Sequence, residues 1–169
     1  MRSRSAIISA TSRNSFSLKP LVVRAAVPNL IPLVTKGDSG SKGTVFLSIS
    51  NKLKVEFIDL AQRLKDLGFK LIATKGTAAH LRNSNIRSKV IWRISDNKSP
   101  DILSIMREGN VNLIINLPTG KRAATDGAQM RRLAVELGIP FITTITGADA
   151  AIKSLEEGEI NYLKPLKKL

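Results

Sequence analysis

VNLIIN, at residues 111–116, is the most apolar of five short segments that predict β-strands, and we expect it to be central in a sheet. The other four are TVFLSI at 44–49, FKLIA at 69–73, KVIW at 89–92 and PFITT at 140–144. Stretches with helical spacing of apolar residues separate these segments. The alternation predicts an α/β domain in which helices cover both faces of a five-stranded parallel sheet.

The predicted helices lie between residues 53 and 67, 78 and 83, 99 and 109, 126 and 138, and 146 and 158. Ser99, Asp126 and Thr146 are expected N-caps, because short polar side chains satisfy the free N–H groups of a first helical turn. The segment Thr74–Thr77 is expected to be a loop that leads into the second helix.

The composition excludes several classes of function. The 169 residues include no cysteine, which removes disulfides, cysteine-ligated zinc and thiol catalysis. His80 is the only histidine, so a histidine metal cluster is excluded, and we expect it to be an ordinary helix residue. Aromatic residues make up 4%, too few for base-stacking platforms. No apolar run approaches the roughly 18–20 residues of a membrane helix, so we expect no membrane partner. We also expect no cofactor or metal.

The net charge of +14 is concentrated at the start of the chain. The first 37 residues carry six basic residues and no acid: Arg2, Arg4, Arg13, Lys19, Arg24 and Lys36. The remainder holds 21 basic and 13 acidic residues, or +8, and the two signs are interspersed. Mixed charge of this kind favours small anionic ligands over nucleic acid. A basic nucleic-acid-associated module remains an alternative, and it predicts strongly salt-dependent binding to DNA or RNA.

Residues 1–35 are rich in Ser and Arg, contain no acid and lack a continuous apolar core. This composition favours a transit peptide for a plastid or a mitochondrion. The alternative is a disordered basic extension of a cytoplasmic protein. We expect a Gly/Ser linker at 36–43, a single domain at 44–158 and a basic tail at 159–169.

Ligands of parallel α/β sheets bind beyond the carboxyl ends of the strands. Hydroxyls, amides, glycine and cations predominate at those ends here, with almost no carboxylates. Gly76 would allow an anion to approach the backbone N–H groups closely, and Thr77 would open a helix there and add its hydroxyl. We therefore expect a small phosphorylated or carboxylated ligand. The candidate residues are Ser48, Lys54, Thr74, Lys75, Gly76, Thr77, Arg93, Asn116, Thr119, Lys121, Arg122 and Thr143.

Three stretches carry a family resemblance: GTVFLSI from residue 43, LGFKLIATKGTAAHL from residue 67, and NLIINLPTGKRAATDGAQMRRLAVELGIPFITT from residue 112. They resemble the methylglyoxal-synthase-like domain, above all the allosteric C-terminal domain of the carbamoyl phosphate synthetase large subunit. The resemblance spans about residues 43–155. It implies a Rossmann-like three-layer sandwich, and an effector such as UMP or IMP, as in bacterial enzymes, or N-acetylglutamate, as in animal mitochondrial enzymes.

The resemblance also implies roles for individual residues. The positions that contact phosphate or base in the family correspond to Lys54, Thr74, Thr77, Arg93, Asn116 and Thr119, and Ser48 lies beside them. Thr143 matches a position associated with ornithine, and Trp92 matches a Trp of the animal enzymes. Leu117–Pro118 stands where the bacterial pattern has a Thr-Thr pair. Trp92 at a strand end is equally consistent with packing.

The resemblance implies a regulatory role in carbamoyl phosphate, arginine or pyrimidine metabolism. One form of this role would be docking onto a separately encoded synthetase. The resemblance also implies a homo-oligomer. The alternative is a diverged methylglyoxal synthase that acts on dihydroxyacetone phosphate and uses Asp96 or Asp101 as its base. The catalytic branch has a His in the loop after the fourth strand, and this sequence has Ala124-Thr125-Asp126 there. We therefore expect no catalytic residue.

Overall fold

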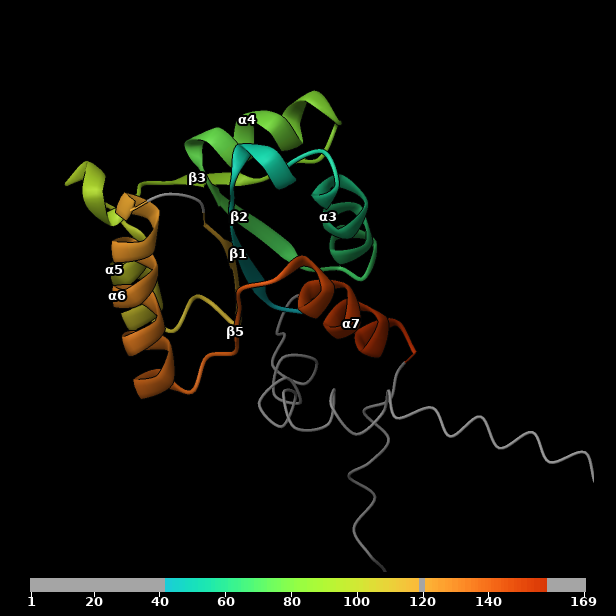
Figure 1. The fold of residues 1–169 in the computed structure, drawn as a ribbon. Helices are drawn as coiled ribbons and strands as arrows, with labels where there is room; N and C mark the ends of the chain where they lie inside the picture. The colour runs from blue at the N-terminus through green and yellow to red at the C-terminus, as the bar shows by residue number, and fades with distance from the viewer. Residues whose placement is uncertain (1–41, 119–120, 158–169) are drawn as a thin grey trace, which may run out of the picture.

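The computed structural model describes residues 42–118 and 121–157, with the side chains of residues 121–124 left undescribed. Five strands alternate with helices along this part of the protein (Figure 1). The strands are β1 (Thr44–Ile49), β2 (Lys70–Thr74), β3 (Lys89–Ile91), β4 (Leu113–Leu117) and β5 (Phe141–Ile142). The helices are α3 (Phe57–Asp66), α4 (Lys75–Asn83), α5 (Ile102–Arg107), α6 (Lys121–Leu137) and α7 (Ile145–Glu156), with single 3-10 turns η1 (Asn51–Leu53) and η2 (Ile94–Asp96).

All four strand pairs of the sheet are parallel, and the strand order is β3-β2-β1-β4-β5. The expected α/β class and five-stranded parallel sheet are therefore confirmed. The central strands are β1 and β4, which pair from Val45 with Leu113 to Ile49 with Leu117. This places the carboxyl ends of β1 and β4 side by side, where Ser48 pairs in register with Asn116.

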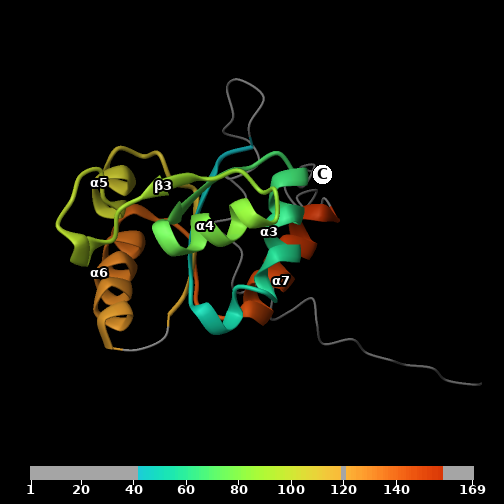
Figure 2. The same ribbon diagram turned by 90° about the horizontal axis from the view of Figure 1, so that it is seen from above.

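Alternate residues of the central strands face opposite layers of helices. Val45 and Leu47 of β1 belong to a core cluster that includes residues of α3, α4 and α7. Phe46, between them, belongs to a second cluster with residues of α5 and α6. Figure 1 and Figure 2 show α5 and α6 on one side of the sheet and α3 and α7 on the other. The domain is a three-layer sandwich because both sheet faces are apolar and each needs a helical cover.

The predicted strands agree with the observed ones, but the starts of α4, α5, α6 and α7 were predicted wrongly. The bounds of β1 are identical, and the other strands differ at their ends by one or two residues. Asp126 is not an N-cap, because residues 121–125 continue the same helix upstream of it. Asp101 takes the place predicted for Ser99, and its carboxylate accepts a hydrogen bond of 2.8 Å from the Ser104 N–H.

The other wrong helix starts are those of α4 and α7. The segment Thr74–Thr77 is not a loop, because Thr74 ends β2 in an extended conformation and Lys75 already begins α4. Thr77 is therefore inside the first turn rather than at its opening. At α7 the N-cap is Thr144 instead of Thr146, and its hydroxyl accepts a hydrogen bond of 3.1 Å from the Gly147 N–H.

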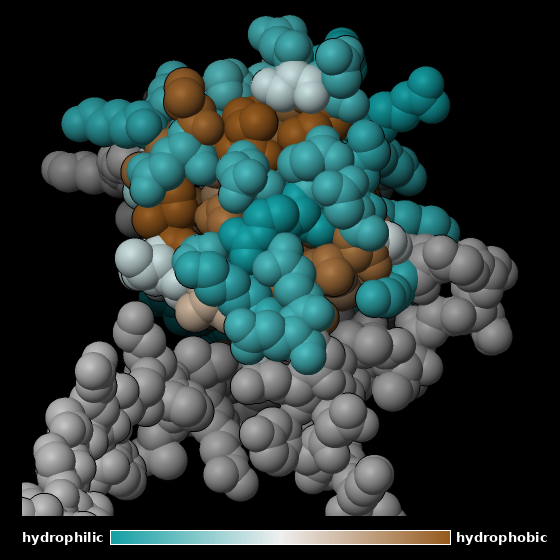
Figure 3. Space-filling model, turned by 90° about the vertical axis from the view of Figure 1, so that its right-hand side faces the viewer, coloured by the Kyte–Doolittle hydropathy of each residue, from teal (hydrophilic) through white to brown (hydrophobic). Residues whose placement is uncertain are grey.

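An ion-pair network joins α3 to α7. The guanidinium of Arg63 lies 2.7 Å from a carboxylate oxygen of Asp149 and 2.6 Å from one of Glu156. Lys153 contacts the other oxygen of Asp149 at 2.7 Å. Figure 3 views the molecule from this side and shows hydrophilic residues across the middle of the face, with hydrophobic residues between them. No helix in the described part of the protein is long and apolar enough to cross a membrane.

Candidate functional site

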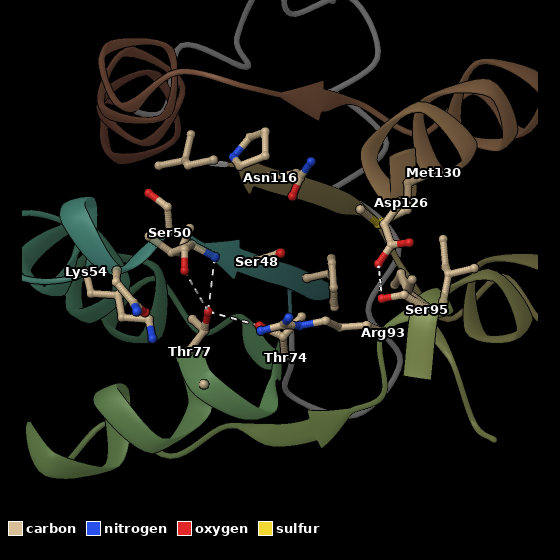
Figure 4. Close-up of a pocket in the computed structure, with 18 residues that line it drawn as sticks. Ser48, Ser50, Lys54, Thr74, Thr77, Arg93, Ser95, Asn116, Asp126 and Met130 are labelled. Carbon is tan, nitrogen blue, oxygen red and sulfur yellow. Dashed lines mark hydrogen bonds between the residues drawn. The ribbon is translucent and has the colours of Figure 1, made fainter. Parts of the chain in front are cut away.

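A polar cavity of about 210 Å³ opens at the carboxyl ends of β1, β2 and β4 (Figure 4). It lies where the sequence predicted a ligand. Polar and charged side chains converge on it from both helical layers and from the segment after β3. They are Ser48, Ser50, Asn51, Lys54, Thr74, Thr77, Arg93, Ser95, Asn116 and Asp126, with Gly76 and several apolar residues completing the wall.

Thr77 joins the first turn of α4 to the end of β1. Its hydroxyl oxygen accepts hydrogen bonds from the Ile49 N–H at 3.0 Å and from the Thr74 hydroxyl at 3.1 Å, and it lies 3.4 Å from the Ile49 carbonyl. Only 2% of Thr77 is exposed. The sequence suggested that this hydroxyl would contact the ligand, but in the structure it is already engaged within the protein. Thr77 and Thr74 thus hold the start of α4 against the strand end.

The start of α4 carries the positive character of the site. The Thr74 hydroxyl does not cap the helix, so the first N–H groups of this nine-residue helix have no partner from that residue's side chain. These free N–H groups and the helix dipole attract anions. A Cβ atom at Gly76 would lie 3.3 Å from Lys54 Nζ and 4.0 Å from an Arg93 guanidinium nitrogen. A larger residue would therefore contact Lys54 Nζ tightly and Arg93 at an ordinary distance, so glycine leaves the most room for Lys54 at the helix start.

Lys54 and Arg93 come from opposite sides of the cavity. Figure 4 shows Arg93 reaching from the end of β3 toward Thr74, and Lys54 entering from the side of η1. Neither cation lies within 4.0 Å of a carboxylate oxygen of any described residue. Burial, and secondarily the nearby positive charge of Arg93, lower the pKa of Lys54 below its ordinary value. A bound anion would relieve both effects by supplying the missing negative charge.

Two buried polar groups in the wall of the cavity have no hydrogen-bond partner among the described residues. They are the side-chain N–H₂ of Asn116, a residue 1% exposed, and the hydroxyl of Ser50, a residue 9% exposed. A Cβ atom at Gly127 of α6 would lie 2.8 Å from the Asn116 amide nitrogen, so glycine is required for this close packing. Buried donors without partners are uncommon in folded proteins. Here they suit a ligand that carries hydrogen-bond acceptors.

One carboxylate, that of Asp126, also lines the cavity. It accepts a hydrogen bond of 2.8 Å from the Ser95 hydroxyl, which ties η2 to α6 (Figure 4). The sequence pattern did not identify either residue as a site residue, because Asp126 had been interpreted as a helix cap. Asp96 and Asp101, the bases of the lyase alternative, do not line the cavity. Their carboxylates accept backbone hydrogen bonds from Arg93 and Ser104 respectively.

The structure brings together seven of the thirteen predicted site residues: Ser48, Lys54, Thr74, Gly76, Thr77, Arg93 and Asn116. Lys75, Trp92 and Thr143 do not line the cavity; Lys75 and Thr143 are exposed, and Trp92 packs against the ammonium of Lys98, 4.4 Å from the ring centre. Thr119 and the side chains of Lys121 and Arg122 lie outside the described residues. The described residues contain no cluster of His, Cys, Asp and Glu that could hold a metal ion.

Comparison with known proteins agrees with this architecture. The family model of the MGS-like domain matches residues 56–143, more than half of the protein. The C-terminal section of a carbamoyl phosphate synthase large chain from Methanocaldococcus jannaschii is 46% identical over 114 residues, and its counterpart from Methanopyrus kandleri is 44% identical over 116 residues. A carbamoyl phosphate synthase large chain from Archaeoglobus fulgidus is 45% identical over 116 residues.

Each of these three alignments covers 68% of this protein but only a small part of the relative. The protein spans 18%, 21% and 11% of their lengths. The crystal structure of ForH is 22% identical and covers 69% of this protein and 80% of that one, with a TM-score of 0.49, a likeness too distant to bear on function. The protein belongs to the MGS-like domain family and is homologous to a part of the carbamoyl phosphate synthase large chain.

Proposed function

We propose that this protein is a regulatory domain that binds a small anionic effector at the carboxyl edge of its sheet. The observation that carries the proposal is the convergence of Lys54 and Arg93 on the free N–H groups at the start of α4, with no carboxylate oxygen of a described residue within 4.0 Å of either cation. Two cations and a helix N-terminus together suit a phosphate or carboxylate group.

The effector that fits is a nucleoside monophosphate such as UMP or IMP, or an N-acetylglutamate-type compound. The unpartnered donors of Asn116 and Ser50 would bind acceptor atoms next to the anionic group. Homology to the carbamoyl phosphate synthase large chain supports a place in arginine or pyrimidine nitrogen metabolism. The partner would be a carbamoyl phosphate synthase, because the relatives carry the matching region within much longer polypeptides. An effector would act by binding the docked and free states with different affinities.

The test is calorimetric and thermal-shift titration of the full-length protein with UMP, IMP, N-acetylglutamate and inorganic phosphate. A ligand at about 100 times its dissociation constant stabilises a fold by about 2.7 kcal/mol, which a thermal shift detects readily. We expect saturable binding of at least one of these compounds. Substitution Lys54→Met should weaken that binding at least about tenfold, since a hydrogen bond to a charged group contributes about 1.5–3 kcal/mol.

Lys52→Met is the matched control. Lys52 lies two residues away in η1, is exposed and does not line the cavity, so its substitution should leave the affinity within about twofold. Equal weakening by both substitutions would show that net charge, rather than this site, determines binding. If none of the four compounds binds, the proposed function is wrong.

The placement of Asp126 is the observation that favours the lyase alternative. Its carboxylate lines the same cavity as the two cations, which is the arrangement that proton abstraction next to a phosphorylated carbonyl compound requires. No histidine lines the cavity among the described residues. Incubation of the purified protein with dihydroxyacetone phosphate should release no methylglyoxal under the proposed function. Release that Asp126→Asn abolishes would establish the lyase instead.

A further inference from the structure

A second cavity, here called the amino-edge cavity, opens at the opposite end of the sheet and has a volume of about 590 Å³. The first residues of three neighbouring strands line it, namely Thr44 of β1, Lys70 of β2 and Lys89 of β3. The cavity that contains Lys54 and Arg93, here called the effector cavity because of the proposed function, lies at the carboxyl ends of the strands. It shares no lining residue with the amino-edge cavity. Ligand pockets commonly have volumes of roughly 300–1,000 Å³, so this cavity is large enough for a small molecule.

Positive charge dominates the amino-edge cavity. Lys65, Lys70, Arg87 and Lys89 line it, and none lies within 4.0 Å of a carboxylate oxygen among the described residues. The one acidic residue in its wall is Glu108, whose carboxylate accepts a hydrogen bond of 3.0 Å from the Asn110 side chain. The cavity therefore has a clear surplus of cations.

Part of this charge has an ordinary structural reason. Lys65 lies in the last turn of α3, where a cation stabilises the negative end of the helix dipole. The other three cations have no such role, because Lys70 and Lys89 begin strands and Arg87 lies between α4 and β3. All three are exposed at the mouth of the same cavity.

Ser88 provides an independent observation. Its hydroxyl is buried and has no hydrogen-bond partner in the part of the protein that the structure describes, and Ser88 lies between Arg87 and Lys89 in the sequence. Arg87 and Ser88 also line another cavity, of about 390 Å³. An anionic oxygen bound in the amino-edge cavity would give this hydroxyl a hydrogen-bond acceptor.

We propose that the amino-edge cavity is a second binding site, separate from the effector site, for a small polyanion with two or more phosphate or carboxylate groups. Arg87, Lys89 and Lys70 would bind its charged oxygens, and Ser88 would donate a hydrogen bond to one of them. A polyanion fits better than a single phosphate because the cations come from separate segments around a wide cavity.

Calorimetric titration of the full-length protein with inorganic tripolyphosphate and with citrate, at about 0.15 M salt to screen diffuse attraction, tests the proposal. The double substitution Arg87→Ala/Lys89→Ala should weaken binding at least about tenfold, because two charge-assisted hydrogen bonds are lost. Ser88→Ala should weaken it less. Lys54→Met should leave it unchanged, which separates this site from the effector site, whether or not that site binds any effector.

The matched control is Lys52→Ala/Arg132→Ala, which removes one lysine and one arginine from exposed positions that line neither cavity. Equal weakening by this pair would overturn the proposal in favour of general charge attraction. The charge-conserving pair Arg87→Lys/Lys89→Arg should retain binding, and thermal unfolding should show that all variants are folded. The proposal would also be overturned, in favour of a nucleic-acid surface, by two results together. These are tight binding of a DNA or RNA duplex that Arg87→Ala/Lys89→Ala abolishes, and no saturable binding of tripolyphosphate or citrate.

Discussion

The α3–α7 interface and the effector cavity both contain an arginine near the protein surface, but the two arginines have opposite surroundings. Arg63 contacts carboxylates of Asp149 and Glu156 at 2.7 and 2.6 Å. The guanidinium of Arg93 has Lys54 nearby, and no carboxylate oxygen of a described residue lies within 4.0 Å of it. The fold supplies ion-pair partners for Arg63, whereas the exposed Arg93 has none among the described residues. The contrast indicates that Arg63 contributes to stability, whereas under the proposed function Arg93 and Lys54 bind the effector.

The largest expected effect is a loss of stability when Thr77, which holds the wall of the effector cavity together, is substituted. The cations of that cavity have no such structural role. Thr77→Val removes the acceptor for the Ile49 N–H and the Thr74 hydroxyl, which are both buried. We expect the free energy of unfolding to fall by about 2 kcal/mol, because buried donors left without partners are costly. Chemical denaturation measures this, with Thr146→Val as control, since Thr146 is exposed on α7. A loss below about 0.5 kcal/mol would mean that water replaces the hydroxyl.

The second prediction compares the two kinds of cation directly. Arg63→Met should lower the free energy of unfolding by about 1 kcal/mol, because it removes a partly buried partner of two carboxylates. Lys54→Met should leave stability unchanged or raise it slightly, because it removes repulsion with Arg93 and breaks no described ion pair. Equal losses in the two variants would contradict the proposed distinction.

The smallest expected effects are changes with pH. At the α3–α7 interface stability should fall at acidic pH, whereas at the effector cavity anion affinity should fall at alkaline pH. Hydrogen bonds from Lys153 and Arg63 lower the pKa of Asp149, and one from Arg63 lowers the pKa of Glu156. Their contribution to stability is therefore present above the unfolded pKa of about 4 and is lost as the pH falls through the lower folded values. The difference in thermal stability between the native protein and Arg63→Met should narrow on acidification.

At the effector cavity the affinity for an anion should change at alkaline pH. Anion binding requires the charged form of Lys54, whose pKa lies below that of an ordinary lysine in the unliganded protein. Affinity should fall as the pH rises through this lowered value, measured by titration with inorganic phosphate. In Lys54→Met this alkaline dependence should disappear, and its persistence there would assign it to another group.

Sequence patterns were sufficient for the sheet and for the location of the candidate site. Apolar segments such as residues 44–49 and 111–116 are local signals, because a strand buried on both faces must be apolar throughout. Polar residues that follow such strands are expected at one edge, because all parallel strands end on the same side. This reasoning identifies Lys54, Gly76, Arg93 and Asn116 from the sequence alone.

Only the tertiary structure determined which polar groups are engaged and which are free. Asp126 and Ser95 are 31 residues apart, and their hydrogen bond in the cavity depends on α6 packing beside η2. Among the described residues, Asn116 and Ser50 have no partners for their buried side-chain groups, while the Thr77 hydroxyl is hydrogen-bonded to Ile49. Helix starts were also decided this way, since several threonines offered similar local caps. Local sequence determines whether a segment is apolar, but hydrogen-bond partners depend on how distant elements pack.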